Sequence, residues 1–414
     1  MTRSGSESDR GGWRAEPSRR EVLALSGGAV LAAVGVAGCG SDGSGGKPSA
    51  TPGTVTAPPA SGVLAANVNQ ALDKIDLAEM AAVSGTWIRG FYVMSGADQG
   101  NPATQTGLAK LLQAAARGYG TVLTTKFQYR NRSIPAPGSP AMKTALARLT
   151  KVLEATMGRV DILTIGNEPF LETSKNDRET PRINTFYEAL ALDAAEYRQR
   201  HFGANCKTKI YMGALNNLDN PSARNEQTRR WMTFTAQTPA IAGVDIHPHV
   251  PSIAAAQKYV DYVLPFLRGD QKFLATEFSL VQLWKRHLSD PVRPAFARRH
   301  GIARGTPVWQ IIANATKQPM DEEQWNAFLL SNPWFAANKN YLTDQMERFR
   351  STGKLAVAAY GITQDAPMAK DFGPHKPPWI FNSMFCPYVC KPEPGGLPGR
   401  NRTWSNGFRA AQQT

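Results

Sequence analysis

The sequence predicts an α/β fold of the (β/α)8 TIM barrel type, and three observations support this prediction. Short β-rich runs alternate with amphipathic segments of helical periodicity eight times along the chain. The length of residues 63–414 suits such a barrel with insertions. Residues 67–70, after the first run, read Asn-Val-Asn-Gln, whereas a doubly wound sheet usually has a Gly-rich phosphate turn there.

The predicted strands are short runs in which branched, aromatic and small residues dominate. In chain order they cover residues 63–68, 86–93, 121–125, 161–165, 209–214, 243–247, 272–277 and 355–360.

Apolar residues three and four positions apart mark the helices between these runs, because that spacing places them on one face. The segment 142–153, for example, carries Met142, Leu146, Leu149 and Leu153 at such spacings. Further helices are expected over residues 72–83, 108–115, 183–197, 259–267 and 341–350. The long connection between the seventh and eighth runs predicts an insertion at this point of the barrel.

The composition limits the class of protein. The chain has 414 residues, of which 42% are hydrophobic, and this fraction excludes a wholly disordered chain and a protein with many membrane spans. Lys and Arg outnumber Asp and Glu by 47 to 33, so the formal net charge is +14. This surplus suits an anionic surface or an acidic polymer. Nucleic acid is not expected, because the chain has no Lys/Arg-rich run and no zinc-finger spacing.

The four cysteines are too few for a disulfide scaffold. Cys386 and Cys390 are four residues apart and would close a small disulfide loop in an oxidising compartment. The sequence leaves that pairing open, and Cys206 would then be an unpaired thiol.

Residues 1–38 have the features of an export signal. Five arginines precede an uncharged stretch over residues 22–38, which is too short for a permanent membrane span. Residues 18–23, Ser-Arg-Arg-Glu-Val-Leu, resemble the twin-arginine export motif. Residues 36–39, Val-Ala-Gly-Cys, resemble a lipobox, in which Cys39 is lipidated and becomes the first residue of the mature protein.

The segment after Cys39 separates this signal from the folded domain. Residues 39–62 are rich in Gly, Ser, Pro and Thr, which is typical of a flexible linker. We therefore expect an exported protein anchored by lipid at Cys39 on the extracytoplasmic face of the cell membrane. Residues 63–414 are expected to form the (β/α)8 domain.

Ionisable and polar residues lie at or after the ends of predicted strands, where the chemistry of a (β/α)8 barrel is located. In strand order these residues are Arg89, Asn167, Glu168, His247, His249 and Glu277. A charged residue that ends an apolar strand is costly unless it faces a site or a partner. Two carboxylates that reach across the barrel mouth suit glycoside hydrolysis. One gives a proton to the leaving oxygen, and the other attacks the sugar or activates water.

Asn167-Glu168-Pro169, Glu277 and Arg89, at the ends of the fourth, seventh and second runs, resemble the retaining glycoside hydrolases of clan A. The resemblance extends from the first run to the eighth. It implies that Glu168 is the general acid/base and that Glu277 is the nucleophile. It also implies that Asn167 hydrogen-bonds the 2-hydroxyl of the sugar and that Arg89 supports the nucleophile.

The expected charges agree with these roles. A cationic Arg89 near Glu277 would keep that carboxylate ionised, while Glu168, with less compensation, is expected to keep its proton near neutrality. Opposed protonation states suit the acid and the nucleophile of a double displacement. The expected activity is retaining hydrolysis of an extracellular or cell-envelope oligo- or polysaccharide, without a cofactor.

Two positions depart from common patterns of the clan and leave the sugar open. The eighth run ends in Tyr360, where Trp is frequent, and residues 247–249 read His-Pro-His near the end of the sixth, where Tyr is frequent. These histidines, Tyr360, Trp284 and Trp379 are expected to bind the substrate, because the C–H faces of sugars stack on aromatic rings. Trp284 is expected in a loop.

The segment over residues 285–304 follows the seventh run and contains six Lys or Arg against one acid, Asp290. Such a charged segment is commonly a solvated face. Alternatively, it forms a rim that attracts a glycan with carboxylate or phosphate groups, since arginine binds such oxyanions in two places at once.

Two other functions use the same residues. The first is a non-catalytic carbohydrate-binding surface lipoprotein; the pair Glu168 and Glu277 argues against it. The second is a metal-dependent hydrolase, because histidines two residues apart at a strand end suggest a metal site. The other four histidines of the chain do not end predicted strands. No metal is therefore expected, and His247 and His249 are interpreted as hydrogen-bond partners of the nucleophile or the sugar.

Overall fold

A computed structural model of the chain describes residues 57–68, 71–206 and 208–412. The predicted signal segment 1–38, Cys39 and most of the predicted linker, residues 40–56, lie outside the described residues.

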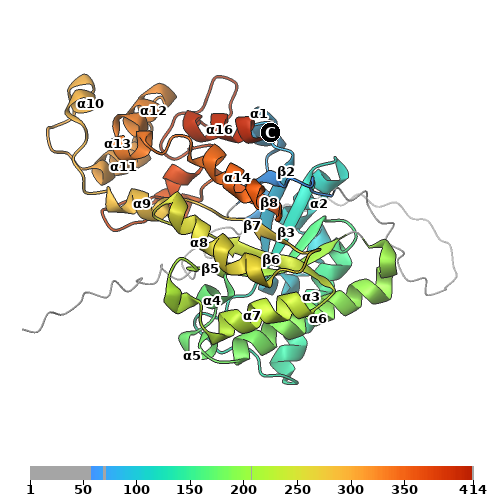
Figure 1. The fold of residues 1–414 in the computed structure, drawn as a ribbon. Helices are drawn as coiled ribbons and strands as arrows, with labels where there is room; N and C mark the ends of the chain where they lie inside the picture. Colours follow the sequence, from blue (N-terminus) through green and yellow to red (C-terminus); the bar gives the residue numbers. More distant parts are fainter. Residues whose placement is uncertain (1–56, 69–70, 207, 413–414) are drawn as a thin grey trace, which may run out of the picture. The chain divides into compact units, whose positions relative to one another are not determined.

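The strands of the described chain run parallel and close into a barrel in sequence order, with β8 paired to β1 (Figure 1). This confirms the predicted fold class. The strands are β1 Val63–Val68, β2 Trp87–Val93, β3 Gly120–Lys126, β4 Ile162–Ile165, β5 Lys209–Asn216, β6 Ile241–His247, β7 Lys272–Ala275 and β8 Leu355–Thr363.

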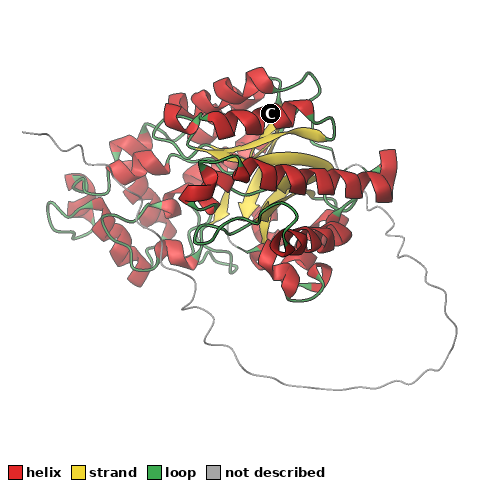
Figure 2. Ribbon diagram, turned by 90° about the horizontal axis from the view of Figure 1, so that it is seen from below, coloured by secondary structure: helices red, strands yellow, loops and turns green. Residues whose placement is uncertain are grey.

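Helices surround these strands and flank them in the second view (Figure 2). The helices up to the end of β6 are α1 Leu77–Ala82, α2 Thr106–Ala116, α3 Pro140–Thr156, α4 Pro169–Glu172, α5 Lys175–Arg178, α6 Arg182–Phe202 and α7 Glu226–Gln237. Those that follow are α8 Ile253–Val263, α9 Val281–Arg286, α10 Pro294–Arg299, α11 Val308–Lys317, α12 Glu322–Ser331, α13 Pro333–Ala336, α14 Tyr341–Ser351, α15 Ala366–Ala369 and α16 Arg402–Gln412. Short 3-10 turns are η2 Leu72–Lys74, η3 Met94–Asp98, η4 Pro102–Thr104, η5 Gly203–Asn205, η6 Pro221–Ala223, η7 Leu264–Phe266 and η8 Trp379–Asn382.

Several of the outer helices begin at capping side chains. Ser139, Asn225 and Ser252 precede α3, α7 and α8, and each side-chain oxygen accepts a hydrogen bond from a backbone N–H of the first turn. These bonds satisfy donors that have no partner inside the helix. The caps thus fix where each helix starts after its strand.

The barrel interior is filled by side chains from alternate strand positions. Trp87 belongs to this inner cluster, whereas Ile88 packs outward under the helices. Since successive side chains of a strand point to opposite faces, Arg89 shares the inner face with Trp87. The inner cluster comprises Val63, Ala65, Trp87, Val122, Ile162, Tyr211, Leu274, Ala356, Val357 and Ala359.

The segment between β7 and β8 carries α9 to α14, and Figure 1 shows α10 to α13 gathered to one side of the strands. An aromatic cluster joins this segment to the C-terminal helix. The Trp284 ring lies 5.6 Å from the Trp334 ring and 6.4 Å from the Trp404 ring, measured between centroids. Helix α14, predicted from its periodicity, packs against α16.

The described cysteines are free thiols: Cys206 is half-buried, and Cys386 and Cys390 are buried. A disulfide between the latter two, which the sequence leaves open, is therefore not present in this structure. In the part of the chain that the structure describes, no helix has the length and apolar character needed to cross a membrane.

Candidate active site

Arg89 organises the inner end of the site, and its side chain is completely buried. Nη1 donates to Glu277 Oε1 at 2.5 Å and to Asn67 Oδ1 at 3.0 Å. Nη2 donates to Asn167 Oδ1 at 2.8 Å, and Nε donates to Thr124 Oγ1 at 3.3 Å. The guanidinium thus joins β1, β2, β3 and the residues that follow β4 and β7.

Asn167 and Glu168 stand on a sharp turn between β4 and α4. Gly166 has φ +97°, and a Cβ there would lie 2.7 Å from the carbonyl oxygen of Gly213, so only glycine fits without displacement. Glu168 is left-handed at φ 44° and ψ 54° and forms the N-cap of α4, followed by Pro169. Its carbonyl accepts the backbone N–H of Glu172 at 2.9 Å. This turn directs the Glu168 side chain inward.

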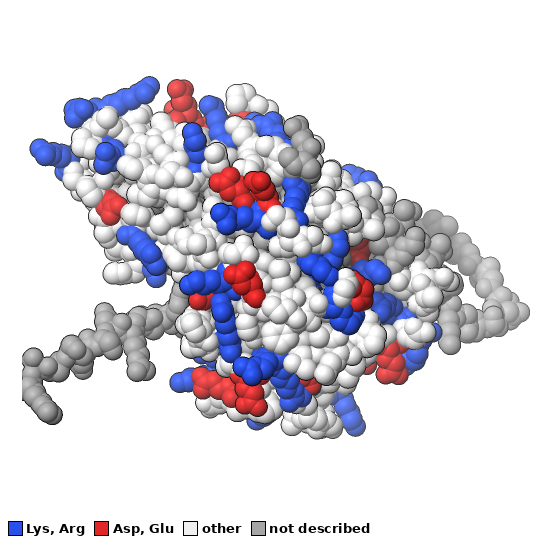
Figure 3. All heavy atoms as spheres, viewed as in Figure 1, with Lys and Arg blue, Asp and Glu red and all other residues white. Residues whose placement is uncertain are grey.

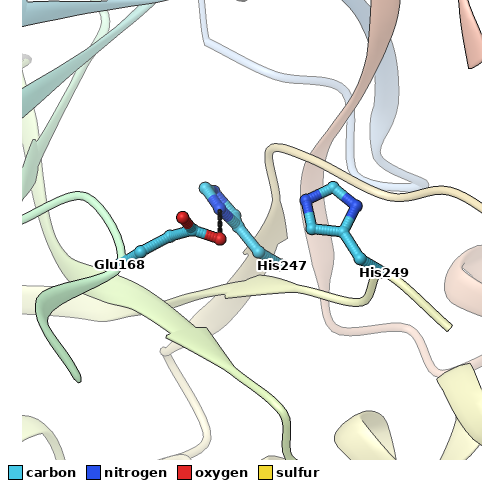
Figure 4. Close-up of side chains that lie close together, drawn as sticks. All are labelled: Glu168, His247 and His249. Carbon is cyan, nitrogen blue, oxygen red and sulfur yellow. Dashed lines mark ion pairs between the residues drawn. The ribbon is translucent and has the colours of Figure 1, made fainter. Parts of the chain in front are cut away.

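His247, at the end of β6, lies between the two glutamates and is completely buried. Its Nδ1 is 3.4 Å from Glu168 Oε1 and 3.9 Å from Glu277 Oε1, and Figure 4 shows the Glu168 carboxylate facing the ring. Its Nε2 is 2.9 Å from Thr276 Oγ1, and that hydroxyl donates to Asp245 Oδ2 at 2.5 Å. Because the hydroxyl has one proton and gives it to Asp245, the Nε2 of His247 carries a hydrogen and donates to Thr276.

His249 approaches Glu277 from the other side. Its Nε2 lies 3.5 Å from Glu277 Oε2, and its Nδ1 lies 2.8 Å from Ser279 Oγ. The Trp379 ring, from η8, meets the His249 ring edge-on at 4.8 Å between centroids. The two oxygens of Glu277 therefore have different partners, Arg89 on Oε1 and His249 on Oε2.

Glu168 and Glu277 are close enough for both carboxylates to act on the same bond of a bound ligand. Since both lie near the same nitrogen of His247, Glu168 Oε1 and Glu277 Oε1 are at most 7.3 Å apart, the sum of 3.4 Å and 3.9 Å. Retaining glycosidases need about 5 to 5.5 Å between carboxyl groups, and inverting ones need about 6.5 to 9.5 Å. The limit applies to this pair of oxygens, and it admits the retaining distance.

Burial and neighbouring charges act in opposite directions on these groups. Burial raises the pKa of the Glu277 carboxyl, but His247 and Arg89 outweigh it and hold this pKa well below its usual value. Burial also raises the pKa of Glu168, but contact with His247 leaves it below its usual value. Burial lowers the pKa of His247, yet Glu277, Asp245 and Glu168 together raise it to about 9.

The expectation that Glu168 keeps its proton near neutrality is therefore wrong. The raised pKa of His247 favours its protonated form, and its Nδ1 faces Glu168 Oε1 at 3.4 Å. The charges of Glu168 and His247 influence each other, so the titration belongs to both groups together.

Two of the expected substrate-binding residues do not reach the site. Trp284 lies in helix α9, not in a loop; it is fully buried, and its Nε1 donates to Asn382 Oδ1. Tyr360 is also fully buried and points outward from β8 to Phe278 and Trp404. Both predictions are corrected: these two rings pack the layer between barrel and helices.

A small cavity of about 10 Å³ lies beside Glu277 and is lined also by Asn67, His249, Gln364 and Trp379. Trp379 is half-buried there, so its ring is available to a ligand. A larger space of about 600 Å³ lies between α1 and the end of β8, and Glu79 is among the residues that line it. It contains none of the predicted site residues, whereas Glu277, His249 and Trp379 line the smaller cavity.

Several residues of the site were not predicted from the sequence. Asn67 and Thr124 hold Arg89, while Asp245 and Thr276 hold His247. A signal existed for two of them. Asp245 lies two residues before His247, hence on the same face of β6, and Thr276 directly precedes a predicted nucleophile.

No protein-family model and no curated protein matches this chain. Solved structures are similar to it at low identity. A GH5-4 broad specificity endoglucanase from Clostridium longisporum is 12% identical over 87% of this chain and 99% of that chain, with a TM-score of 0.49. CbXyn10B in its native form is 12% identical over 84% and 96%, with a TM-score of 0.47. A beta-glucosidase from Exiguobacterium marinum is 8% identical over 86% and 98%, with a TM-score of 0.45. The barrel assignment itself rests on the strand pairing described above.

Proposed function

We propose that this protein is a retaining glycoside hydrolase that acts on an extracellular or cell-envelope glycan by double displacement. One observation carries the proposal. Glu168 and Glu277, which are 109 positions apart in the chain, both lie within 4 Å of His247 Nδ1 at the C-terminal end of the barrel. Active sites of (β/α)8 barrels lie at that end, and paired carboxylates are the groups that glycoside hydrolysis needs.

In the first step Glu277 attacks the anomeric carbon and forms a covalent glycosyl ester. Its low pKa keeps it ionised, and Arg89 keeps one oxygen in place, so that Oε2 is the oxygen directed to the cavity side. Glu168 passes a proton to the leaving oxygen as the glycosidic bond breaks. The proton comes from the pair that Glu168 forms with His247.

In the second step Glu168 accepts a proton from water, and the water oxygen attacks the anomeric carbon to release Glu277. Asn167 has a defined orientation for this reaction. Its Oδ1 accepts from Arg89, which leaves its amide Nδ2 as a donor to a sugar hydroxyl. Hydrogen bonds of this kind to the 2-hydroxyl strengthen in the transition state.

The backbone at Glu168 supports a role beyond structure. A glutamate at φ 44° costs of order 1 to 3 kcal/mol, and such strain persists where surrounding structure enforces it. Gly166 and Pro169 on either side enforce the turn. Strained residues of this kind are concentrated at active sites.

The direct test is a panel of aryl glycosides and cell-envelope polysaccharides with purified protein. Glu277→Gln should abolish turnover, and Glu168→Gln should reduce it by about 10²- to 10⁴-fold. Glu188→Gln is the matched control, because Glu188 pairs with Arg230 on the outer helices. No hydrolysis of any substrate by the wild type would refute the proposal.

Stereochemistry separates retention from inversion. Proton NMR of the first product formed should show the same anomeric configuration as the substrate. Azide should rescue Glu277→Ala and yield a glycosyl azide of inverted configuration. With Glu168→Ala it should yield one of retained configuration, because azide then attacks the covalent intermediate. A product of inverted configuration from the wild type would contradict the assignment of Glu277 as nucleophile.

We also propose that the protein is exported and lipid-anchored at Cys39. The support is the sequence alone, namely the paired arginines, the uncharged stretch and the lipobox-like residues before Cys39. Cys39→Ala should release the protein from the membrane fraction or stop its maturation, because the acyl chains supply the membrane affinity. Unchanged fractionation with membranes would refute the anchor.

The substrate that we propose is anionic. Arg293, Arg298, Arg299 and Arg304 are exposed around α10, and Figure 3 shows Lys and Arg side chains projecting over that part of the surface. The nearby acid, Asp290, is already paired with His287. Guanidinium groups in the connection between β7 and β8, which also contains Glu277, suit carboxylate or phosphate groups on a glycan.

A further inference from the structure

Two histidines and a carboxylate of the candidate active site are arranged as metal ligands are. One ligand atom from each of Glu168, His247 and His249 lies within 4.8 Å of the other two, and Figure 4 shows these side chains together. Imidazole is a ligand that Zn²⁺, Cu²⁺ and Ni²⁺ favour, whereas Mg²⁺ and Ca²⁺ prefer oxygen.

The outward ring nitrogen of each histidine is held by a hydroxyl. His247 Nε2 lies 2.9 Å from Thr276 Oγ1, and His249 Nδ1 lies 2.8 Å from Ser279 Oγ. Metal-binding histidines are oriented in this manner, because a hydrogen bond at one nitrogen directs the lone pair of the other toward the ion. The inward nitrogens are His247 Nδ1 and His249 Nε2, and both face carboxylates.

His247 Nδ1 is buried and makes no hydrogen bond within the described structure. The carboxylate oxygens that face it are 3.4 Å away on Glu168 and 3.9 Å away on Glu277, longer than an ordinary charged hydrogen bond. His249 Nε2 is likewise 3.5 Å from Glu277 Oε2. Ligands of a tetrahedral ion with bonds of about 2.1 Å stand about 3.4 Å apart. The separations between proposed ligand atoms, 3.4 Å from His247 Nδ1 to Glu168 Oε1 and 3.5 Å from His249 Nε2 to Glu277 Oε2, match this spacing.

The local charge also favours a cation. Glu168, Glu277 and Asp245 are three carboxyl groups around His247, and both oxygens of Asp245 accept hydrogen bonds from Thr276. Arg89 contributes one positive charge. The carboxylates outnumber the arginine, and a divalent ion that replaces the proton of His247 would compensate their charge. Buried charges need such compensation.

We propose that Glu168, His247 Nδ1 and His249 Nε2 bind one divalent transition-metal ion of the Zn²⁺ class, with Glu277 Oε2 as a fourth ligand. This site goes beyond the proposed hydrolase and does not depend on it. If hydrolysis is the activity, the ion occupies both catalytic carboxylates and excludes the sugar. Zn²⁺ is then a reversible inhibitor that competes with substrate.

The test is calorimetric titration of the purified, EDTA-treated full chain with ZnCl₂ and, separately, with MgCl₂, without any substrate. We expect one Zn²⁺ per chain and no Mg²⁺. His249→Ala should weaken Zn²⁺ binding by at least about tenfold through loss of a ligand. Ser279→Ala, which removes only the hydroxyl that orients His249, should weaken it less. His201→Ala is the control, because His201 is exposed on α6 and stacks on Tyr197.

Co²⁺ gives a second readout that is independent of activity. Its visible absorption should report nitrogen ligands in the wild type and in His201→Ala, and should change in Ser279→Ala even if His249→Ala does not fold. Absence of stoichiometric Zn²⁺ binding, or equal affinity in the wild type and Ser279→Ala with an unchanged Co²⁺ spectrum, would overturn the site. Zn²⁺ binding without glycoside hydrolysis by the metal-free protein would instead refute the proposed function and leave the site standing.

Discussion

Arg89 donates a hydrogen bond to Glu277 across the barrel interior at 2.5 Å, and no part of the arginine side chain is exposed. The two residues come from β2 and from the end of β7. Because Glu277 is itself nearly buried, its negative charge depends on this neighbour for compensation.

Arg89→Met should therefore impair both stability and activity. The free energy of unfolding should fall by about 3 to 5 kcal/mol, since a buried carboxylate loses its partner. Turnover should fall by about 10²- to 10³-fold, because Glu277 and Asn167 lose their orienting donor. Chemical denaturation and steady-state kinetics measure the two effects. Arg230→Met, which breaks the surface pair with Glu188, is the control and should leave stability and turnover nearly unchanged. Equal losses in the two variants would contradict this role of Arg89.

Gly166→Ala should cost more stability than the same change at Gly118. Both glycines have positive φ, +97° and +87°, but the space around Gly118 is open, whereas a Cβ at Gly166 meets the Gly213 carbonyl oxygen. Strain alone costs about 1 kcal/mol, and the clash adds to it. Gly166→Ala should also lower activity because Asn167 and Glu168 follow directly. Thermal melts with kinetics check this; similar behaviour of the two variants would show that the turn tolerates a side chain.

Trp379→Ala should raise the KM for the glycan by about tenfold with a smaller change in kcat. The half-buried ring lines the cavity beside Glu277 and contacts no reacting group. A lost stacking surface weakens ground-state and transition-state binding alike. Trp309→Ala, on the half-buried Trp309 of α11, is the matched control. A fall in kcat with unchanged KM would place Trp379 in the chemical step instead.

Replacement of Arg298 and Arg299 by Gln should reduce turnover of anionic glycans and leave neutral ones unchanged. The loss should shrink as salt rises, because salt screens exposed charges. A control with equal charge change is Lys143→Gln together with Arg200→Gln, both exposed on other helices. Equal activity of the variant and the parent on every substrate at low salt would show that the arginines of α10 are only solvated and do not attract the substrate.

Glu79 makes folding stability depend on pH. Burial and the nearby Asp76 raise its pKa from 4.5 to about 7, although Thr363 donates a hydrogen bond that lowers it. The folded state then holds more protons than the unfolded state between these values, so stability falls as pH rises from about 4.5 to 7. Glu79→Gln should stabilise the protein by about 1 to 2 kcal/mol at pH 8, after allowance for partial exposure, and by little at pH 4.5. Urea denaturation at both pH values measures the difference; an equal effect at both would contradict the raised pKa.

The sequence was sufficient for the barrel because each strand is a short apolar run followed by a segment of helical period. It was not sufficient for α7, whose buried face is mostly polar: Gln227, Thr228 and Thr235 lie beside Trp231 and Met232. Hydrophobic periodicity cannot reveal such a helix, since capping by Asn225 and tertiary contact stabilise it.

The sequence also could not predict which face of β8 carries the Tyr360 side chain. A strand buried on both faces has no alternation of polar and apolar residues, and every residue of β8 up to Ile362 is buried. The sequence therefore does not show which alternate set faces the interior. In the structure Ala359 faces the barrel interior, so the next residue, Tyr360, points outward to the helices. Glu168 and Glu277 could be identified without this difficulty, because each is a charged residue that follows the end of an apolar strand.

The protonation of Glu168 depends on a contact between distant parts of the chain. Arg89 and Glu277 were paired by resemblance alone, and the role of His247 as the group that carries the proton follows only from its position between both glutamates. Short-range patterns in the sequence contain no information about contacts among Glu168, His247 and Glu277, which are far apart in the chain. Its charges become visible only when β4, β6 and β7 are placed side by side.

The pairing of β8 with β1 has a consequence for biosynthesis. Leu355–Thr363 is made late, and until it is available the ring remains open between its first and last strands. Helix α16 follows later still, and Gln412 in its last turn donates to the carbonyl of Leu64 in β1. A nascent chain that already contains every reactive side chain described above therefore has no stable ring in which to hold them. The arrangement of Arg89, Glu168, His247 and Glu277 should form only after residues 355–412 have been synthesised.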